Sequence, residues 1–220
     1  RPANPLQPNG VAMFLIAGLA VPPEMTRFFR ALQGFFPSEH WHPAPVLAVP
    51  LIVLGEAATL TAMEELDHGL ITLRLKRSIP LSHTGFTLVE RQRRILLAAL
   101  VQGSETDHLS VKIRSAARRA GLAPAPLYTP LAVPLADVTA APVEEVNHWL
   151  SIHYATAPDQ EELYEFTVFS SGKNRDPLSL EKETDYPFTN CFDLIRICYN
   201  SDTVALAVSA TRRWHVSIAL

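Results

Sequence analysis

Leu47-Ala48-Val49-Pro50-Leu51 returns, letter for letter, as Leu131-Ala132-Val133-Pro134-Leu135. Chance repetition of an apolar, proline-punctuated strand would account for the five letters alone. The flanks favour duplication, because each copy follows an apolar strand, an amphipathic helix and a loop rich in proline and aromatic residues. The sequence therefore predicts an α+β fold of two lobes, each an antiparallel sheet backed by helices. The two pentapeptide strands should line a cleft between the lobes.

The composition is that of a globular chain. Its 220 residues, 48% of them hydrophobic, suffice for one large domain or two small lobes and argue against disorder. A formal net charge of −3 gives no overall attraction to nucleic acid or to a membrane, so phosphate binding would need a local cleft. The two cysteines, Cys191 and Cys198, make no disulfide framework, and we expect a cytoplasmic protein. The apolar run at residues 11–21 is too short to cross a bilayer and predicts a buried strand.

Apolar periodicity predicts the other elements. A helix that begins at Pro22 and Pro23 should lie on the first strand with one apolar face, made of Met25, Phe28, Phe29, Leu32 and Phe36. A second long helix should have Ser104 as its N-cap and expose Arg114, Arg118 and Arg119. We also expect a helix at residues 57–66 that stops at Gly69. The expected strands are residues 46–54, 70–75, 85–90, 94–101, 149–154, 163–170 and 180–188, with a last hairpin at 204–209 and 214–219.

The flanks of the first pentapeptide resemble the 2H phosphoesterase superfamily, in particular its bacterial 2'-5' RNA ligase-like, or RNA 2',3'-cyclic phosphodiesterase, branch. The matching features are the strand Phe14-Leu15-Ile16-Ala17, the helix start Pro22-Pro23-Glu24, Trp41, the prolines of residues 43–45, and Leu54-Gly55-Glu56. Residues 113–122 are similar to the family's arginine- and alanine-rich helix before its second motif. The resemblance implies that residues 1–188 form the family domain and that residues 189–220 are a C-terminal extension.

The chain differs from the family at the residues of the catalytic motifs. The family signature is a pair of His-x-Thr/Ser motifs, but here the histidine positions hold Ala48 and Ala132 and the hydroxyl positions hold Pro50 and Pro134. An ungapped count would instead place Leu131 at the second histidine, and neither alignment restores an imidazole. In the resembled mechanism one imidazole is the general base, the other the general acid, and the hydroxyls bind the non-bridging phosphate oxygens. The side chains of alanine and proline can neither transfer a proton nor donate a hydrogen bond to phosphate, so we expect a catalytically inactive scaffold.

The resemblance implies RNA or a cyclic nucleotide phosphodiester as the ligand, and no cofactor or metal. Phe14, Trp41 and Tyr128 are the candidate binding residues, and the rings of Trp41 and Tyr128 are suited to stacking on bases. The basic turn Arg91-Gln92-Arg93 either touches a phosphate backbone or is a solvated hairpin tip.

Other histidines leave alternatives open. His108 and His215 each begin a His-x-Ser pattern. His108 falls in a predicted helix, where residues i and i+2 diverge by about 200°, whereas His215 falls on a predicted strand. The His40-x-His42 pair suggests a metal site but lacks a third ligand at a suitable spacing.

Three functions remain open from the sequence. One is a phosphodiesterase disabled by loss of both histidines, either through deliberate replacement or as a natural pseudoenzyme. The second is an RNA- or nucleotide-binding module without turnover. The third is a protein-interaction domain that keeps only the fold.

Overall fold

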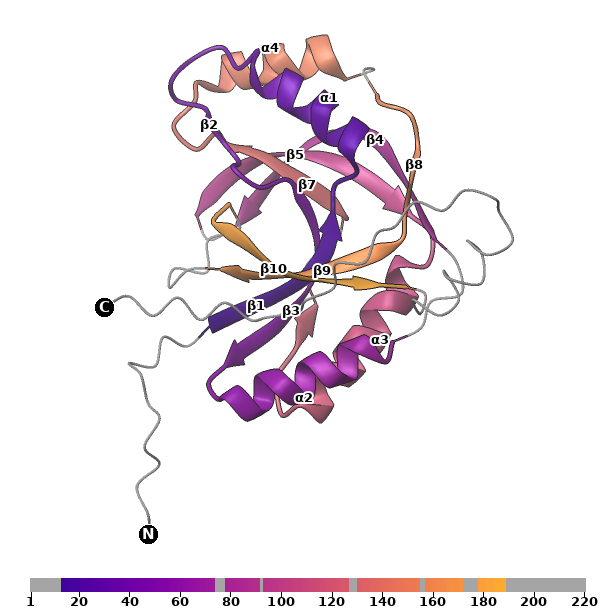
Figure 1. The fold of residues 1–220 in the computed structure, drawn as a ribbon. Helices are drawn as coiled ribbons and strands as arrows, with labels where there is room; N and C mark the ends of the chain where they lie inside the picture. Colours follow the sequence, from indigo (N-terminus) through magenta and orange to yellow (C-terminus); the bar gives the residue numbers. More distant parts are fainter. Residues whose placement is uncertain are drawn as a thin grey trace, which may run out of the picture.

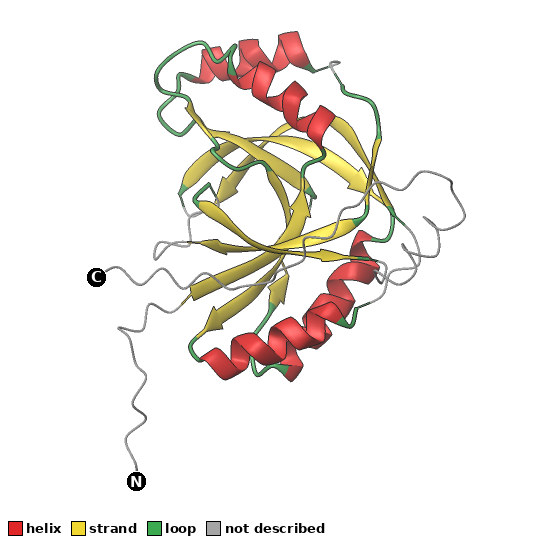
Figure 2. Cartoon of the chain, in the orientation of Figure 1, coloured by secondary structure: helices red, strands yellow, loops and turns green. Residues whose placement is uncertain are grey.

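The structure is a computed structural model that describes residues 13–73, 78–91, 93–126, 130–154, 157–171 and 178–188. Within these ranges, two five-stranded antiparallel sheets lie against each other, and two helices cover the outer face of each sheet (Figures 1 and 2). The two-lobed α+β architecture predicted from the repeat is thereby confirmed.

Each sheet is built from segments that are distant in the sequence. The first sheet has the order β10-β9-β1-β3-β6 and the second has the order β2-β7-β5-β4-β8. The first sheet's strands are β1 (Met13–Ala20), β3 (Ala48–Ala57), β6 (Ala125–Pro126), β9 (Glu165–Ser171) and β10 (Leu180–Pro187). The second sheet's strands are β2 (His42–Pro43), β4 (Ile79–Arg91), β5 (Arg94–Gly103), β7 (Ala132–Asp137) and β8 (Glu161–Leu163).

The two halves of the chain repeat one unit. In the first, β1 leads through α1 (Pro23–Gln33) to β3, its antiparallel partner; in the second, β5 leads through α3 (Thr106–Arg119) to β7. The short strands are exchanged, since β2 of the first unit pairs with β7 and β6 of the second unit pairs with β3. This reciprocal pairing is what a pseudo-two-fold axis between the sheets produces.

The repeated pentapeptides form the same irregular strand twice. Pro50 lies opposite Gly18 and Pro134 lies opposite Ala98, and in each pair of strands the register shifts at this point. The leucine that follows each proline has no partner in the register and is the extra residue of a bulge. A proline inside a sheet is tolerated at a bulge, because the N–H that it lacks is not needed for the ladder there.

Helix α1 covers the second sheet, and the expectation that it lies on the first strand is wrong. The Phe29 ring lies 5.6 Å from that of His83 on β4, and Gln33 Nε2 donates to the Leu135 carbonyl of β7 at 2.8 Å. Helix α3, from the other half, packs against β3 of the first sheet. Each unit therefore covers the sheet of the other unit with its helix (Figure 1).

Helix α2 (Leu60–Ile71) passes through the expected stop at Gly69, so the strand predicted at residues 70–75 is wrong. A Cβ on Gly69 would lie 3.3 Å from the Cβ of Ala116 on α3. The glycine therefore serves close packing of α2 on α3 and does not end the helix. The N-cap is Thr59, whose Oγ1 accepts from the Ala62 backbone N–H at 3.2 Å.

Two other expectations need correction. The strand predicted at residues 149–154 is part of α4 (Val143–His153), because Val146 and Trp149, three residues apart, are the buried face of a helix with acidic residues in its first turn. Helix α3 begins after Glu105, which has a left-handed backbone (φ 68°), so Ser104 is not its N-cap. The strands predicted at 46–54, 85–90, 94–101, 163–170 and 180–188 are confirmed with shifted ends, and the last hairpin lies outside the described residues.

Candidate functional site

A small hollow opens where β3 of the first sheet meets β7 of the second. Among the described residues, its lining comes from four strands and one loop residue, namely Pro50, Val89, Arg91, Leu96, Ala98, Pro130, Ala132 and Pro134. Its volume of about 40 Å³ holds roughly three water molecules at 10–15 Å³ each. Ligand pockets usually measure about 300 Å³ or more, so only a small part of a nucleotide fits inside this hollow.

Strand periodicity places the lining residues on one face of the second sheet. Residues two apart on a strand share a face, so Ala132 and Pro134 point the same way on β7. Their register partners on β5 are Leu100 and Ala98, and Val89 on β4 lies opposite Leu96. The β4–β5 hairpin thus supplies half of the hollow. Sequence reasoning predicted the hairpin but missed its contribution, which the alternation of residues on it would have indicated.

Three of the four motif positions meet at this hollow, and the fourth does not. Pro50, Ala132 and Pro134 line it together. Ala48 is only 1% exposed and packs in a separate apolar cluster with Ile16, Phe169 and Leu180, with Phe14 and Val46 at its border. The candidate binding residue Phe14 therefore contacts the cluster that buries Ala48 and is absent from the lining of the hollow.

The lining of the hollow is almost wholly apolar. Among its described residues only Arg91 carries a charge, and none is a histidine, carboxylate, thiol or hydroxyl. A guanidinium stays protonated at neutral pH and cannot act as a general base. The lining can therefore attract an anion at Arg91 but offers no proton-transfer pair.

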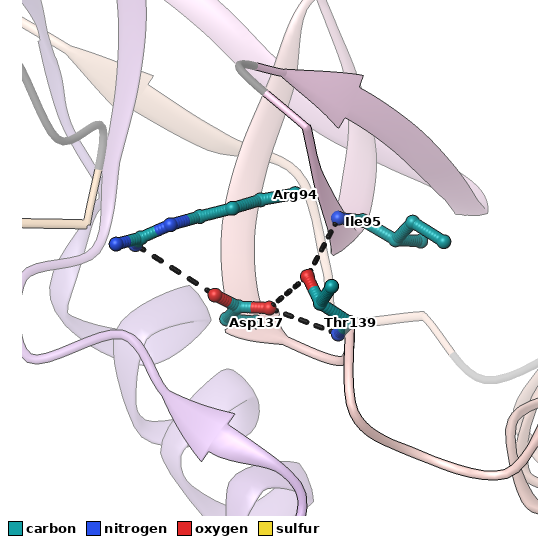
Figure 3. A network of polar contacts seen from close by, with 4 residues as sticks. All are labelled: Arg94, Ile95, Asp137 and Thr139. Carbon is teal, nitrogen blue, oxygen red and sulfur yellow. Dashed lines mark hydrogen bonds and ion pairs between the residues drawn. The ribbon is translucent and has the colours of Figure 1, made fainter.

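Asp137 lies at the end of β7, opposite Leu96, and its carboxylate takes part in a network of hydrogen bonds and an ion pair (Figure 3). Its Oδ1 accepts from the Thr139 backbone N–H at 2.9 Å and from Thr139 Oγ1 at 2.5 Å, and its Oδ2 lies 3.7 Å from Nη1 of Arg94. Thr139 Oγ1 in turn accepts from the Ile95 backbone N–H at 2.9 Å. The carboxylate thus fixes the chain where it leaves β7.

Trp41 packs between Phe36, in the loop after α1, and α4. It is 3% exposed, its ring centroid lies 5.0 Å from that of Phe36 and 5.9 Å from that of Trp149, and its Nε1 donates to Glu145 Oε2 at 3.3 Å. In this position the indole has no open face for stacking on a base. Tyr128 lies outside the described residues.

No histidine of the described chain lines the hollow. His83 is buried against Phe29 and Phe86 beneath α1, and neither of its ring nitrogens has a hydrogen-bond partner in the described part of the chain. Burial lowers the pKa of His83. The nearby Gly85 backbone raises this pKa to a smaller extent, although its contact with the ring is not within hydrogen-bond geometry. His108 is exposed on α3, as predicted, and His215 lies outside the described residues.

Within the described ranges, no three or more His, Cys, Asp or Glu side chains are placed to hold a metal ion. The His40 and His42 side chains are both exposed. In the same part of the chain, no helix combines the length and apolar character needed to cross a membrane.

No family model and no curated protein matches the sequence. Solved structures do match. E. coli LigT complexed with NADP+ superposes with a TM-score of 0.59 at 19% identity, over 81% of this chain and 99% of that one. The chain therefore has the fold of LigT. A structure described as a phosphoesterase (TM-score 0.58, 18% identity, 81% and 99% coverage) and TT0787 of Thermus thermophilus (0.54, 15%, 80% and 98%) share it.

The 2H phosphoesterase fold explains why the repeat lies at the hollow. The two copies of the pentapeptide lie on β3 and β7, the strands through which the two sheets contact each other. At identities below 20% the similarity establishes this fold and leaves the chemistry to be judged from the residues of this chain.

Proposed function

We propose that this chain is a phosphodiester-binding protein of the 2H phosphoesterase fold that binds RNA or a cyclic nucleotide without hydrolysing it. The observation that carries the proposal is the content of the motif positions, which are Ala48, Pro50, Ala132 and Pro134. General acid and general base catalysis each supply about 10²- to 10⁴-fold, so the loss of both removes about 10⁴- to 10⁸-fold of rate.

Arg91 supports the binding of an anion at the hollow. Its guanidinium presents planar donors that match two phosphate oxygens at once. LigT, which has the same fold, has been solved with phosphate, with 3'-AMP and with ATP. The small volume of the hollow means that a phosphate enters while ribose and base lie over its rim.

A protein-interaction module is a second candidate, and the apolar lining favours it. Val89, Leu96 and Ala98 face the two motif prolines, so the hollow also suits an apolar side chain of a partner.

Calorimetry with 2',3'-cyclic AMP tests the first proposal. The wild-type chain should bind, and Arg91→Gln should weaken binding by about tenfold or more, because hydrogen bonds to charged groups contribute about 1.5–3 kcal/mol. Arg27→Gln is the matched control, since Arg27 is an exposed arginine of α1 paired only with Glu24 among the described residues.

The calorimetry cell should contain intact cyclic AMP at the end of the titration. A folded chain that does not bind cyclic AMP would overturn the proposal and leave the interaction module.

A further inference from the structure

A second hollow lies on α3 and shares no lining residue with the first among the described residues. Its lining among the described residues is Val111, Arg114, Ser115, Arg118 and Arg119, all of α3, and its volume is about 380 Å³. We call it the α3 hollow. Helix α3 covers the outer face of the first sheet (Figure 1), whereas the first hollow lies where β3 and β7 meet.

Three arginines give the α3 hollow a local positive charge in a chain whose net charge is −3. None of the ion pairs found in the described part of the chain involves Arg114, Arg118 or Arg119. Arg118 and Arg119 are exposed in the last turn of α3, where the helix dipole favours cations.

Arg114 requires a different explanation, because it lies one turn earlier. Its Nε is shielded from solvent and has no hydrogen-bond acceptor among the described residues. Shielded donors are nearly always paired, so this nitrogen is an exception. Arg114 also lines the α3 hollow, so its guanidinium can pair with an anion there through its terminal nitrogens.

The spacing of the three guanidiniums suits a chain of phosphates. Arg114 and Arg118 are one helical turn apart, a rise of about 6 Å, and Arg119 extends the series by one more residue. Each guanidinium can pair with two phosphate oxygens. Ser115 adds a hydroxyl and Val111, 60% exposed, adds an apolar patch, which together match the edge of a ribose.

We propose that the α3 hollow binds the phosphate backbone of single-stranded RNA, independently of sequence and of the hollow between the sheets. The inference does not rest on the function proposed for that first hollow.

Fluorescence anisotropy with labelled decauridylate, measured over a series of salt concentrations, tests this inference. Each neutralised phosphate of a single strand contributes about −0.7 to the slope of log K against log salt, so three arginines contribute about −2. Arg118→Ala and Arg119→Ala should each make the slope shallower by about 0.7. The control Arg27→Ala removes the same charge from α1 and should leave the slope unchanged.

Arg114→Lys separates hydrogen bonding from charge. It keeps the cation and removes the planar guanidinium that can pair with two phosphate oxygens, so RNA should bind more weakly at an unchanged salt slope. Circular dichroism should confirm that this variant is folded. Because Arg118 and Arg119 are exposed, their alanine variants keep the test decisive if Arg114→Lys does not fold.

Three results would overturn the inference: no binding of decauridylate by the wild-type chain, equal salt slopes in wild type and both alanine variants, or tighter binding of a decaglutamate peptide than of the RNA. The last result would point to an acidic protein segment instead. Saturating 2',3'-cyclic AMP should not displace the RNA. Failure at the first hollow therefore shows as absent cyclic AMP binding, and failure at the α3 hollow as unchanged slopes.

Discussion

The two pentapeptides have identical sequences and the same bulge, yet the alanine of the first is sealed and the alanine of the second is open. Ala48 is 1% exposed, whereas Ala132 lines the hollow. The difference comes from the neighbouring strand. Phe169 of β9 packs into the cluster of Ala48, while Val89 of β4, at the corresponding place, leaves a gap. The closure of a cleft is thus set by residues beside the repeat and not by the repeat itself.

Restoring histidine in each half separately is the strongest test of this difference. Ala48→His would insert a large polar ring into a closed apolar cluster and should cost about 3 kcal/mol or more, from overpacking and an unpaired polar group. Ala132→His faces the hollow and should cost less than about 1 kcal/mol, as for an exposed site. Urea unfolding of the two variants measures both values, and equal costs would show that the halves do not differ.

Gly18 and Ala98 occupy equivalent positions opposite the two prolines. A Cβ on Gly18 would lie 2.5 Å from the Val49 carbonyl oxygen, a backbone atom that cannot move aside cheaply. Gly18→Ala should therefore lower the free energy of unfolding by about 2–3 kcal/mol, whereas Ala98→Gly should lower it by about 1 kcal/mol. Thermal unfolding would refute the close approach if Gly18→Ala were neutral.

Asp137 distinguishes the end of β7 from the end of the pentapeptide segment in β3, where Val53 stands three residues after the proline. Asp137→Val makes the two strands alike and removes acceptors for two donors of Thr139 and for Arg94. Because these groups are partly exposed, the loss should be about 1 kcal/mol. Thr139→Val removes Oγ1 and leaves the Arg94 pair, so it should cost less than Asp137→Val; a larger cost for Thr139→Val would contradict the central role of the carboxylate.

The core beneath α1 and α4 makes stability depend weakly on pH through His83. Burial lowers the pKa of His83, so the neutral ring is the stabilising form. As the pH falls below about 6.5, His83 becomes protonated in the unfolded chain but stays neutral in the folded chain. The free energy of unfolding therefore decreases until the pH reaches the folded-state pKa of His83. His83→Phe should remove this decrease in urea titrations between pH 5 and 7.5.

Two other groups must be separated from His83 in that experiment. Burial also lowers the pKa of His153, which acts with the same sign. Burial and the nearby Asp185 raise the pKa of Glu165, so its contribution is lost as pH rises above about 4.5. Subtracting the His83→Phe profile from that of wild type cancels both, and a flat difference would show that His83 is not responsible.

The sequence was informative where local pattern and tertiary packing agree. The repeated Leu-Ala-Val-Pro-Leu and its flanks predicted the duplicated, two-lobed fold. Gly69 was misinterpreted because a glycine that ends a helix and one that admits a neighbouring helix look alike until Ala116 is placed beside it. The sealing of Ala48 depends on Phe169, far away in the chain, and local pattern carries no such information.

Turnover of 2',3'-cyclic AMP by the wild-type chain from pH 5 to 8 tests most directly the claim that the cleft has lost its proton-transfer groups. The account predicts no hydrolysis above the uncatalysed rate at any pH. Hydrolysis with a bell-shaped pH profile would reveal an acid and a base acting on the bound phosphodiester, and would contradict the account.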